Sequence, residues 1–128
     1  MSVLNQVVSK SIMYVPGPIV SIFARKYIAG DTLDDAVRVT RRLNAQGIKS
    51  TIDVLGEFIT TKGEASQFKN QALEVLKTIH RTDINANLSI KPTQMGLNLD
   101  PDFAYANIEE IVAYAQSIKN FVRIDMED

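Results

Sequence analysis

The sequence of 128 residues contains no cysteine. A chain without cysteine cannot form a disulfide scaffold, use a thiol nucleophile or bind zinc through thiolates, and it suits a reducing compartment such as the cytoplasm. It also has no excess of basic residues, because 14 Lys and Arg stand against 15 Asp and Glu. No nucleic-acid partner is therefore expected. The length allows one domain with a sizeable core.

Acidic residues are absent from residues 1–30, which hold three basic ones, Lys10, Arg25 and Lys26. Polar residues and prolines interrupt the apolar positions of this segment, so it lacks the features of a secretory signal and the length of a membrane span. Weak helical periodicity predicts a helical lead-in over residues 1–30. This basic, amphipathic segment could lie on an anionic membrane surface or pack against the domain.

Beyond residue 30 the hydrophobic pattern alternates between helix and strand. It predicts helices from Asp31 or Thr32 to a stop at Gly47, then over residues 64–80 and 100–120, and strands over residues 48–55, 84–91 and 121–127. Two of the helix starts carry capping signals, Thr32-x-x-Asp35 and the pair Asp100-Pro101. A β-α-β-α-β order with helical crossovers implies a parallel sheet.

Each predicted strand has one apolar face and one polar face. The polar positions are Thr51 and Asp53 in the first strand, Asn87, Ser89 and Lys91 in the second, and Arg123 and Asp125 in the third. Strands covered on both sides by helices are normally apolar on both faces. The charges of the four ionisable residues sum to zero, so a paired polar interior is feasible.

This polar face favours a (β/α)8 barrel, whose strands point alternate residues into the lumen, over a doubly wound open sheet. The predicted fold class is α/β. Residues 31–128 are expected to form a truncated βαβαβ stretch, a partial barrel with about three of the eight parallel strands, preceded by the leading N-terminal helices.

Barrel active sites lie at the carboxyl ends of the strands. Lys91 and Asp125 occupy those ends and are the candidate functional residues, whereas Asp53 and Arg123 lie deeper and are expected to form an internal ion-pair network. The sequence shows no phosphate-binding loop, no nucleophile elbow and no metal-ligand cluster.

Five stretches, taken together, resemble the monofunctional proline dehydrogenases: residues 24–36, 42–47, 51–57, 89–97 and 123–128. The resemblance implies a (β/α)8 barrel with extra N-terminal helices that binds FAD. It also implies oxidation of L-proline to Δ1-pyrroline-5-carboxylate, with electrons passed to a membrane quinone. Proteins of this kind would be cytoplasmic, in peripheral contact with the inner membrane.

The resemblance also implies roles for three residues. Lys91 matches a lysine that contacts the substrate, Asp125 an active-site aspartate, and Met126 a residue that contacts the flavin. A complete barrel needs about 250 residues, so the chain is expected to be an N-terminal part of such an enzyme, inactive alone.

Two alternatives remain open at this point. Lys91 could form a Schiff base with a carbonyl substrate in a lyase or aldolase barrel. The domain could instead be non-catalytic, with the polar strand face binding a ligand or a partner subunit.

Overall fold

The computed structural model of the chain describes residues 30–56 and 58–126. The helical lead-in predicted for residues 1–30 lies, except for Gly30, outside the described residues. The chain divides into two compact units, Met1–Asp35 and Ala36–Asp128. In the first unit, Thr32 Oγ1 accepts the Asp35 backbone N–H at 3.2 Å, and Asp35 Oδ2 accepts the Thr32 N–H at 3.3 Å. The predicted capping box is therefore confirmed.

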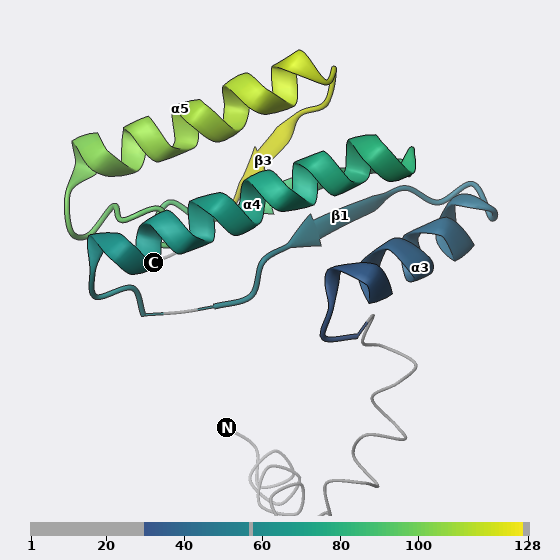
Figure 1. The fold of residues 1–128 in the computed structure, drawn as a ribbon, viewed down its shortest axis with the longest axis horizontal. Coiled ribbons are helices and arrows are strands. Elements are labelled where there is room, and N and C mark those ends of the chain that lie inside the picture. Colours follow the sequence, from purple (N-terminus) through teal and green to yellow (C-terminus); the bar gives the residue numbers. More distant parts are fainter. Residues whose placement is uncertain (1–29, 57, 127–128) are drawn as a thin grey trace, which may run out of the picture. The chain divides into compact units, whose positions relative to one another are not determined.

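The described elements alternate between helix and strand as predicted (Figure 1). They are α3 (Leu33–Asn44), β1 (Ser50–Asp53), α4 (Lys62–Thr82), β2 (Ala86–Ile90), α5 (Pro101–Ser117) and β3 (Val122–Ile124). The strands form one parallel sheet in the order β1-β2-β3. The α/β class and the parallel sheet are thus confirmed, although each strand is shorter than the sequence pattern predicts.

Capping side chains fix where the two long helices begin. Asp100 Oδ1 accepts the backbone N–H groups of Asp102 and Phe103, both at 3.1 Å, so the predicted start of α5 is confirmed. Helix α4 begins two residues before the predicted position. Its start is set by Thr61, whose Oγ1 accepts the Glu64 N–H at 3.2 Å, a third capping signal that the periodicity did not reveal.

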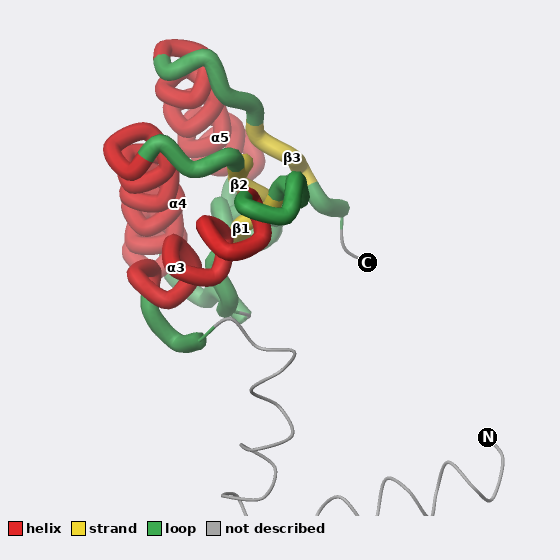
Figure 2. Tube along the Cα trace, turned by 90° about the vertical axis from the view of Figure 1, so that its right-hand side faces the viewer, coloured by secondary structure: helices red, strands yellow, loops and turns green. Residues whose placement is uncertain are grey.

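Helices α4 and α5 lie side by side along one face of the sheet, as Figure 2 shows. Right-handed crossovers in the strand order β1-β2-β3 place both helices on the same face. Alternate residues of β2 point into this layer and are buried, namely Ala86, Leu88 and Ile90. The helices also bury apolar residues in this layer, including Ala72, Val75, Leu76 and Ile79 of α4 and Ile111 and Ala115 of α5.

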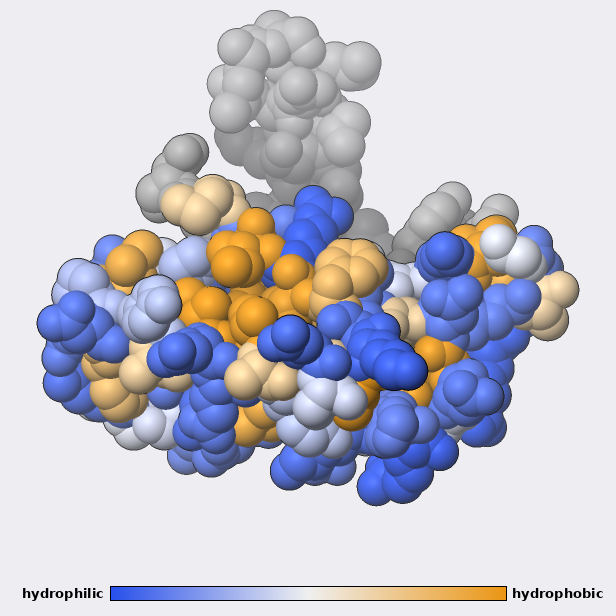
Figure 3. Space-filling view, turned by 90° about the horizontal axis from the view of Figure 1, so that it is seen from above, coloured by the Kyte–Doolittle hydropathy of each residue, from blue (hydrophilic) through white to orange (hydrophobic). Residues whose placement is uncertain are grey.

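The third strand is less covered than its pattern predicts. Val122 is half-buried, but Ile124 is 45% exposed and Met126 is 77% exposed. In the described sheet β3 pairs only with β2, so its outer edge and the adjoining side of α5 lack a neighbour. Seen from the α5 side, hydrophobic surface gathers between hydrophilic flanks (Figure 3). Tyr105 and Val112 of α5 are also exposed.

Candidate active site

The polar residues predicted for the three strands share one face of the sheet. Asp53 of β1 lies beside Ser89 of β2, and Ser89 lies beside Arg123 of β3. Because side chains alternate along a strand, this row points away from the face that buries Leu88 and Ile90. The sheet therefore has one face packed against helices and one face that carries charge.

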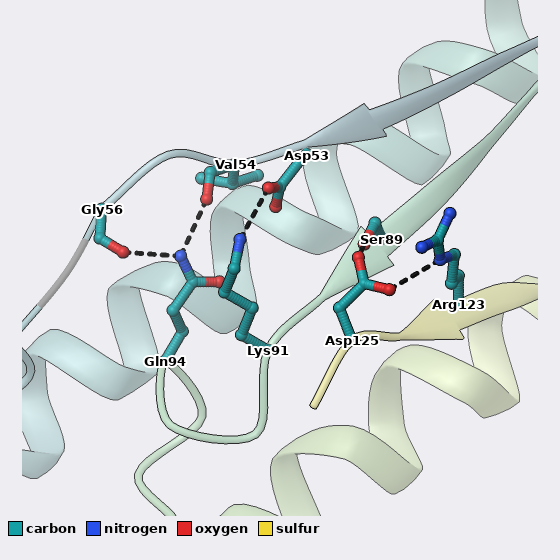
Figure 4. Close-up of polar contacts among 8 residues, drawn as sticks. All are labelled: Asp53, Val54, Gly56, Ser89, Lys91, Gln94, Arg123 and Asp125. Atoms are coloured by element: carbon teal, nitrogen blue, oxygen red, sulfur yellow. Dashed lines mark hydrogen bonds and ion pairs between the residues drawn. The ribbon is translucent and has the colours of Figure 1, made fainter. Parts of the chain in front are cut away.

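Lys91 follows the last residue of β2 and turns back toward β1 (Figure 4). Its Nζ lies 2.8 Å from Asp53 Oδ2, and the two side chains are 21% and 30% exposed. Partial burial strengthens such a pair relative to one in open water. The second carboxylate oxygen of Asp53 is buried and finds no hydrogen-bond partner among the described residues. Asp53 thus fixes the position of the Lys91 ammonium group.

Asp125 follows β3 and is held at both carboxylate oxygens (Figure 4). Arg123 Nε donates to Oδ1 at 2.6 Å, and the Ser89 hydroxyl donates to Oδ2. The backbone N–H of Asp125 donates to the Ile90 carbonyl at 2.9 Å, which ties the residue to β2. The Ser89 hydrogen bond, followed by Arg123 and the charge of Lys91, holds the pKa of Asp125 below its ordinary value.

A buried glutamine fixes the chain that leaves β1. Gln94 is 3% exposed and lies in the turn that follows β2. Its Nε2 donates to the carbonyl oxygens of Val54 and Gly56, at 2.9 and 2.8 Å (Figure 4). The turns after β1 and β2 are therefore joined at the carboxyl end of the sheet, beside Lys91.

The structure brings both predicted functional residues to this end of the sheet. Lys91 is close enough for its charge to lower the pKa of Asp125. Met126 lies next to Asp125 with its side chain largely exposed. Asp53 and Arg123 are both ion-paired, as expected, and their partners are the two candidate functional residues, Lys91 and Asp125.

Sequence reasoning missed two further members of the site. The strand pattern marks Ser89 only as a polar position, although its place on the charged face is a usable signal for a contact with Asp125. Gln94 gave no signal, because it lies in a turn where no periodicity applies. Its role depends on the path of the chain after β1, which only the folded structure reveals.

Comparison with known proteins identifies the family. A family model described as proline dehydrogenase matches residues 36–128. The chain belongs to the proline dehydrogenase family. The match includes Lys91, Asp125 and the residues that hold them, and it confirms the resemblance on which the predicted function rests.

Members of the proline dehydrogenase family resemble the chain over most of its length. Proline dehydrogenase 1 from Bacillus subtilis (strain 168) is 37% identical over 105 residues, which cover 82% of this chain and 35% of that protein. Proline dehydrogenase 2 from Bacillus subtilis subsp. natto is 36% identical over 107 residues, covering 84% and 35%. Proline dehydrogenase from Deinococcus radiodurans is 29% identical over 108 residues, covering 82% and 35%. The chain thus spans about a third of the length of these relatives.

Proposed function

We propose that this chain contributes to a proline dehydrogenase that oxidises L-proline to Δ1-pyrroline-5-carboxylate. The observation that carries the proposal is a fixed cation and a fixed carboxylate at the carboxyl end of one parallel sheet, Lys91 held by Asp53 and Asp125 held by Arg123 and Ser89. The family membership of the chain and the names of its relatives support the same reaction.

In this proposal the two charges orient a zwitterionic amino acid. The Lys91 ammonium group binds the substrate carboxylate, and Asp125 is the active-site carboxylate that completes the charged environment around the substrate. Oxidation removes a hydride from the carbon next to nitrogen, and the nitrogen gives up a proton as the C=N bond forms. Both residues act before this step, by holding the reacting carbon in one place.

The residues present fit a flavin as the redox group, and we infer that it is FAD. Met126 offers an exposed, polarisable thioether directly after Asp125, suited to contact with an aromatic ring system. A bound flavin supplies the hydride acceptor that the reaction needs, because no side chain can accept a hydride. We further infer that a quinone is the final electron acceptor. The enzyme would then be cytoplasmic and in peripheral contact with the inner membrane. Among the described helices, none is long and apolar enough to cross a membrane.

We further propose that the three strands are part of a (β/α)8 barrel, with residues 1–30 as its helical lead-in and residues 31–128 as its first βαβαβ stretch. A barrel lumen would enclose the charged face of the sheet. The next strand of such a barrel would pair with the outer edge of β3, where Ile124 is exposed. The chain covers 35% of the length of Proline dehydrogenase 1 from Bacillus subtilis (strain 168), which is compatible with three of the eight strands of a barrel.

The test is proline-dependent reduction of a flavin bound to the complete gene product. We expect the purified protein to show flavin absorbance that L-proline bleaches without oxygen. Replacement of Lys91 by methionine should raise KM for proline at least about tenfold, since a charge-assisted contact with the carboxylate is lost. Lys77→Met, on an exposed position of α4, is the matched control and should leave KM unchanged.

The proposal would be wrong if the purified protein carried a flavin whose absorbance L-proline did not bleach. The Schiff-base alternative predicts a stable adduct on Lys91 after borohydride treatment with a carbonyl compound, found by mass mapping. That chemistry needs a neutral amine, whereas Lys91 Nζ is ion-paired with Asp53 at 2.8 Å. The non-catalytic alternative predicts neither bleaching nor an adduct.

A further inference from the structure

The strand next to β3 carries a serine that faces the proposed active-site carboxylate. Ser89 is 3% exposed and lies beside Arg123 in the sheet register. Its hydroxyl donates to one oxygen of Asp125, while Arg123 donates to the other. A neutral donor from β2 and a cation from β3 thus hold the carboxylate from two sides.

The two restraints differ in strength. The Arg123 side chain is 62% exposed, and ion pairs in contact with water contribute little to stability. Ser89 is buried on a central strand, and its hydrogen bond to a charged group is of the strong kind. The hydroxyl therefore restrains Asp125 more than the guanidinium group does.

Asp125 needs such a restraint because a competing cation is close. Among the described residues, two cations act on it, namely Arg123 of β3 and Lys91 after β2, and Lys91 is itself paired with Asp53 of β1. The Lys91 ammonium group attracts Asp125, yet it is hydrogen-bonded to Asp53. If Asp125 swung onto Lys91, the two groups that the substrate should meet would neutralise each other.

We propose that Ser89 is a positioning residue: its hydroxyl keeps the Asp125 carboxylate at the end of β3 and apart from Lys91. This inference rests on the proposed function for its consequence in catalysis. The hydrogen bond itself is independent of any reaction. Support from a buried side chain is what keeps an active-site group in a productive orientation.

The experiment replaces Ser89 in the complete gene product. Ser89→Ala should lower kcat for proline oxidation about tenfold, because one strong hydrogen bond to the carboxylate is lost. It should also move the acid limb of the pH profile to higher pH, since the hydroxyl is the largest factor that lowers the pKa of Asp125. Ser89→Thr keeps the hydroxyl and should restore both. Asn87→Ala, on the same strand and face, should change neither.

A second readout does not need activity. Carbon-13 NMR of labelled aspartate, with the Asp125 signal identified by its loss in Asp125→Asn, should show a higher Asp125 pKa in Ser89→Ala than in the parent and in Asn87→Ala. If Ser89→Ala unfolds, Ser89→Cys, close in size but a weak donor, should show the same direction.

The outcomes separate the two proposals. A parent protein that fails to oxidise proline removes the proposed function, and the NMR titration still decides the role of Ser89. A parent that oxidises proline, with kcat, pH profile and Asp125 pKa all unchanged in a folded Ser89→Ala variant, overturns the positioning role.

Discussion

Two glycines with left-handed backbones show how single residues shape this chain. Gly47 ends the turn after α3 with φ of +77°, and nothing lies within 4 Å of where its Cβ would be. Gly96, in the turn between β2 and α5, has φ of +100° and is buried. A Cβ on Gly96 would lie 3.3 Å from a Phe103 ring carbon and 3.4 Å from Ala65. Gly96 therefore allows the left-handed backbone of this turn and also the close approach of Phe103 of α5 and Ala65 of α4.

Substitution by alanine should separate these two effects. Gly47→Ala carries only the backbone strain, and we expect it to lower the free energy of unfolding by about 1 kcal/mol. Gly96→Ala adds crowding against Phe103, so about 2–3 kcal/mol is expected. Urea unfolding of both variants measures the difference. Equal losses at the two positions would show that packing around Gly96 has no effect on stability.

At the scale of elements, the helix starts lie close to the candidate site. Helices α4 and α5 run antiparallel to the strands, so their first turns lie at the carboxyl end of the sheet. Lys62 at the start of α4 is ion-paired with Asp100, the N-cap of α5, at 2.6 Å. Its ammonium group also lies 5.1 Å from the centre of the Phe103 ring. One side chain thus joins the two helix starts.

Asp100 should contribute to stability mainly as a cap. Asp100→Ala removes its hydrogen bonds to the Asp102 and Phe103 backbones, and we expect a loss of about 1–2 kcal/mol. Asp100→Asn keeps a capping oxygen and loses only the exposed pair with Lys62, so it should lower the free energy of unfolding by less than Asp100→Ala does. Chemical unfolding of both variants checks this order. If the asparagine variant is as unstable as the alanine variant, the ion pair is the dominant contribution.

At the scale of the whole molecule, the sequence predicted elements well because they depend on local signals. The Asp100-Pro101 start and the alternation in β2 are readable from neighbouring residues. The parallel sheet followed from the order of elements. The ion-pair partners within the site could not be predicted from the sequence, because the strand pattern does not distinguish Asp53 from Asp125 as the partner of Lys91. The register and the Ser89 hydroxyl decide that choice.

Strand lengths were over-predicted for a related reason. A period of two continues beyond the last residue pair of the sheet register, Ile90 with Ile124, as it does through Asp125 and Met126 after β3. Pairing, rather than pattern, ends a strand. The same residues after the strand ends carry the candidate chemistry, so the sequence located the site better than it located the strand boundaries.

The charged contacts also predict how the unit Ala36–Asp128 responds to acid. Among the described residues of this unit, three carboxyl groups have a pKa below the ordinary value: Glu64, mainly through the Thr60 backbone N–H; Asp100, mainly through Lys62; and Asp125, mainly through Ser89. Their ordinary values are 4.5, 3.8 and 3.8. Because the folded protein binds these protons less readily than the unfolded chain, the three groups stabilise the fold fully above about pH 5.

This stabilisation should be lost as the pH falls from about 5 through the lowered pKa values, because protonation removes each contact. The urea midpoint measured between about pH 7 and pH 2 should therefore decrease on the acid side. A variant with Glu64→Gln, Asp100→Asn and Asp125→Asn cannot gain these protons, and its midpoint should fall less steeply below pH 5. Curves of equal slope for parent and variant would mean that other carboxyl groups set the acid sensitivity. A parent midpoint that rises toward acid would contradict the direction of all three shifts.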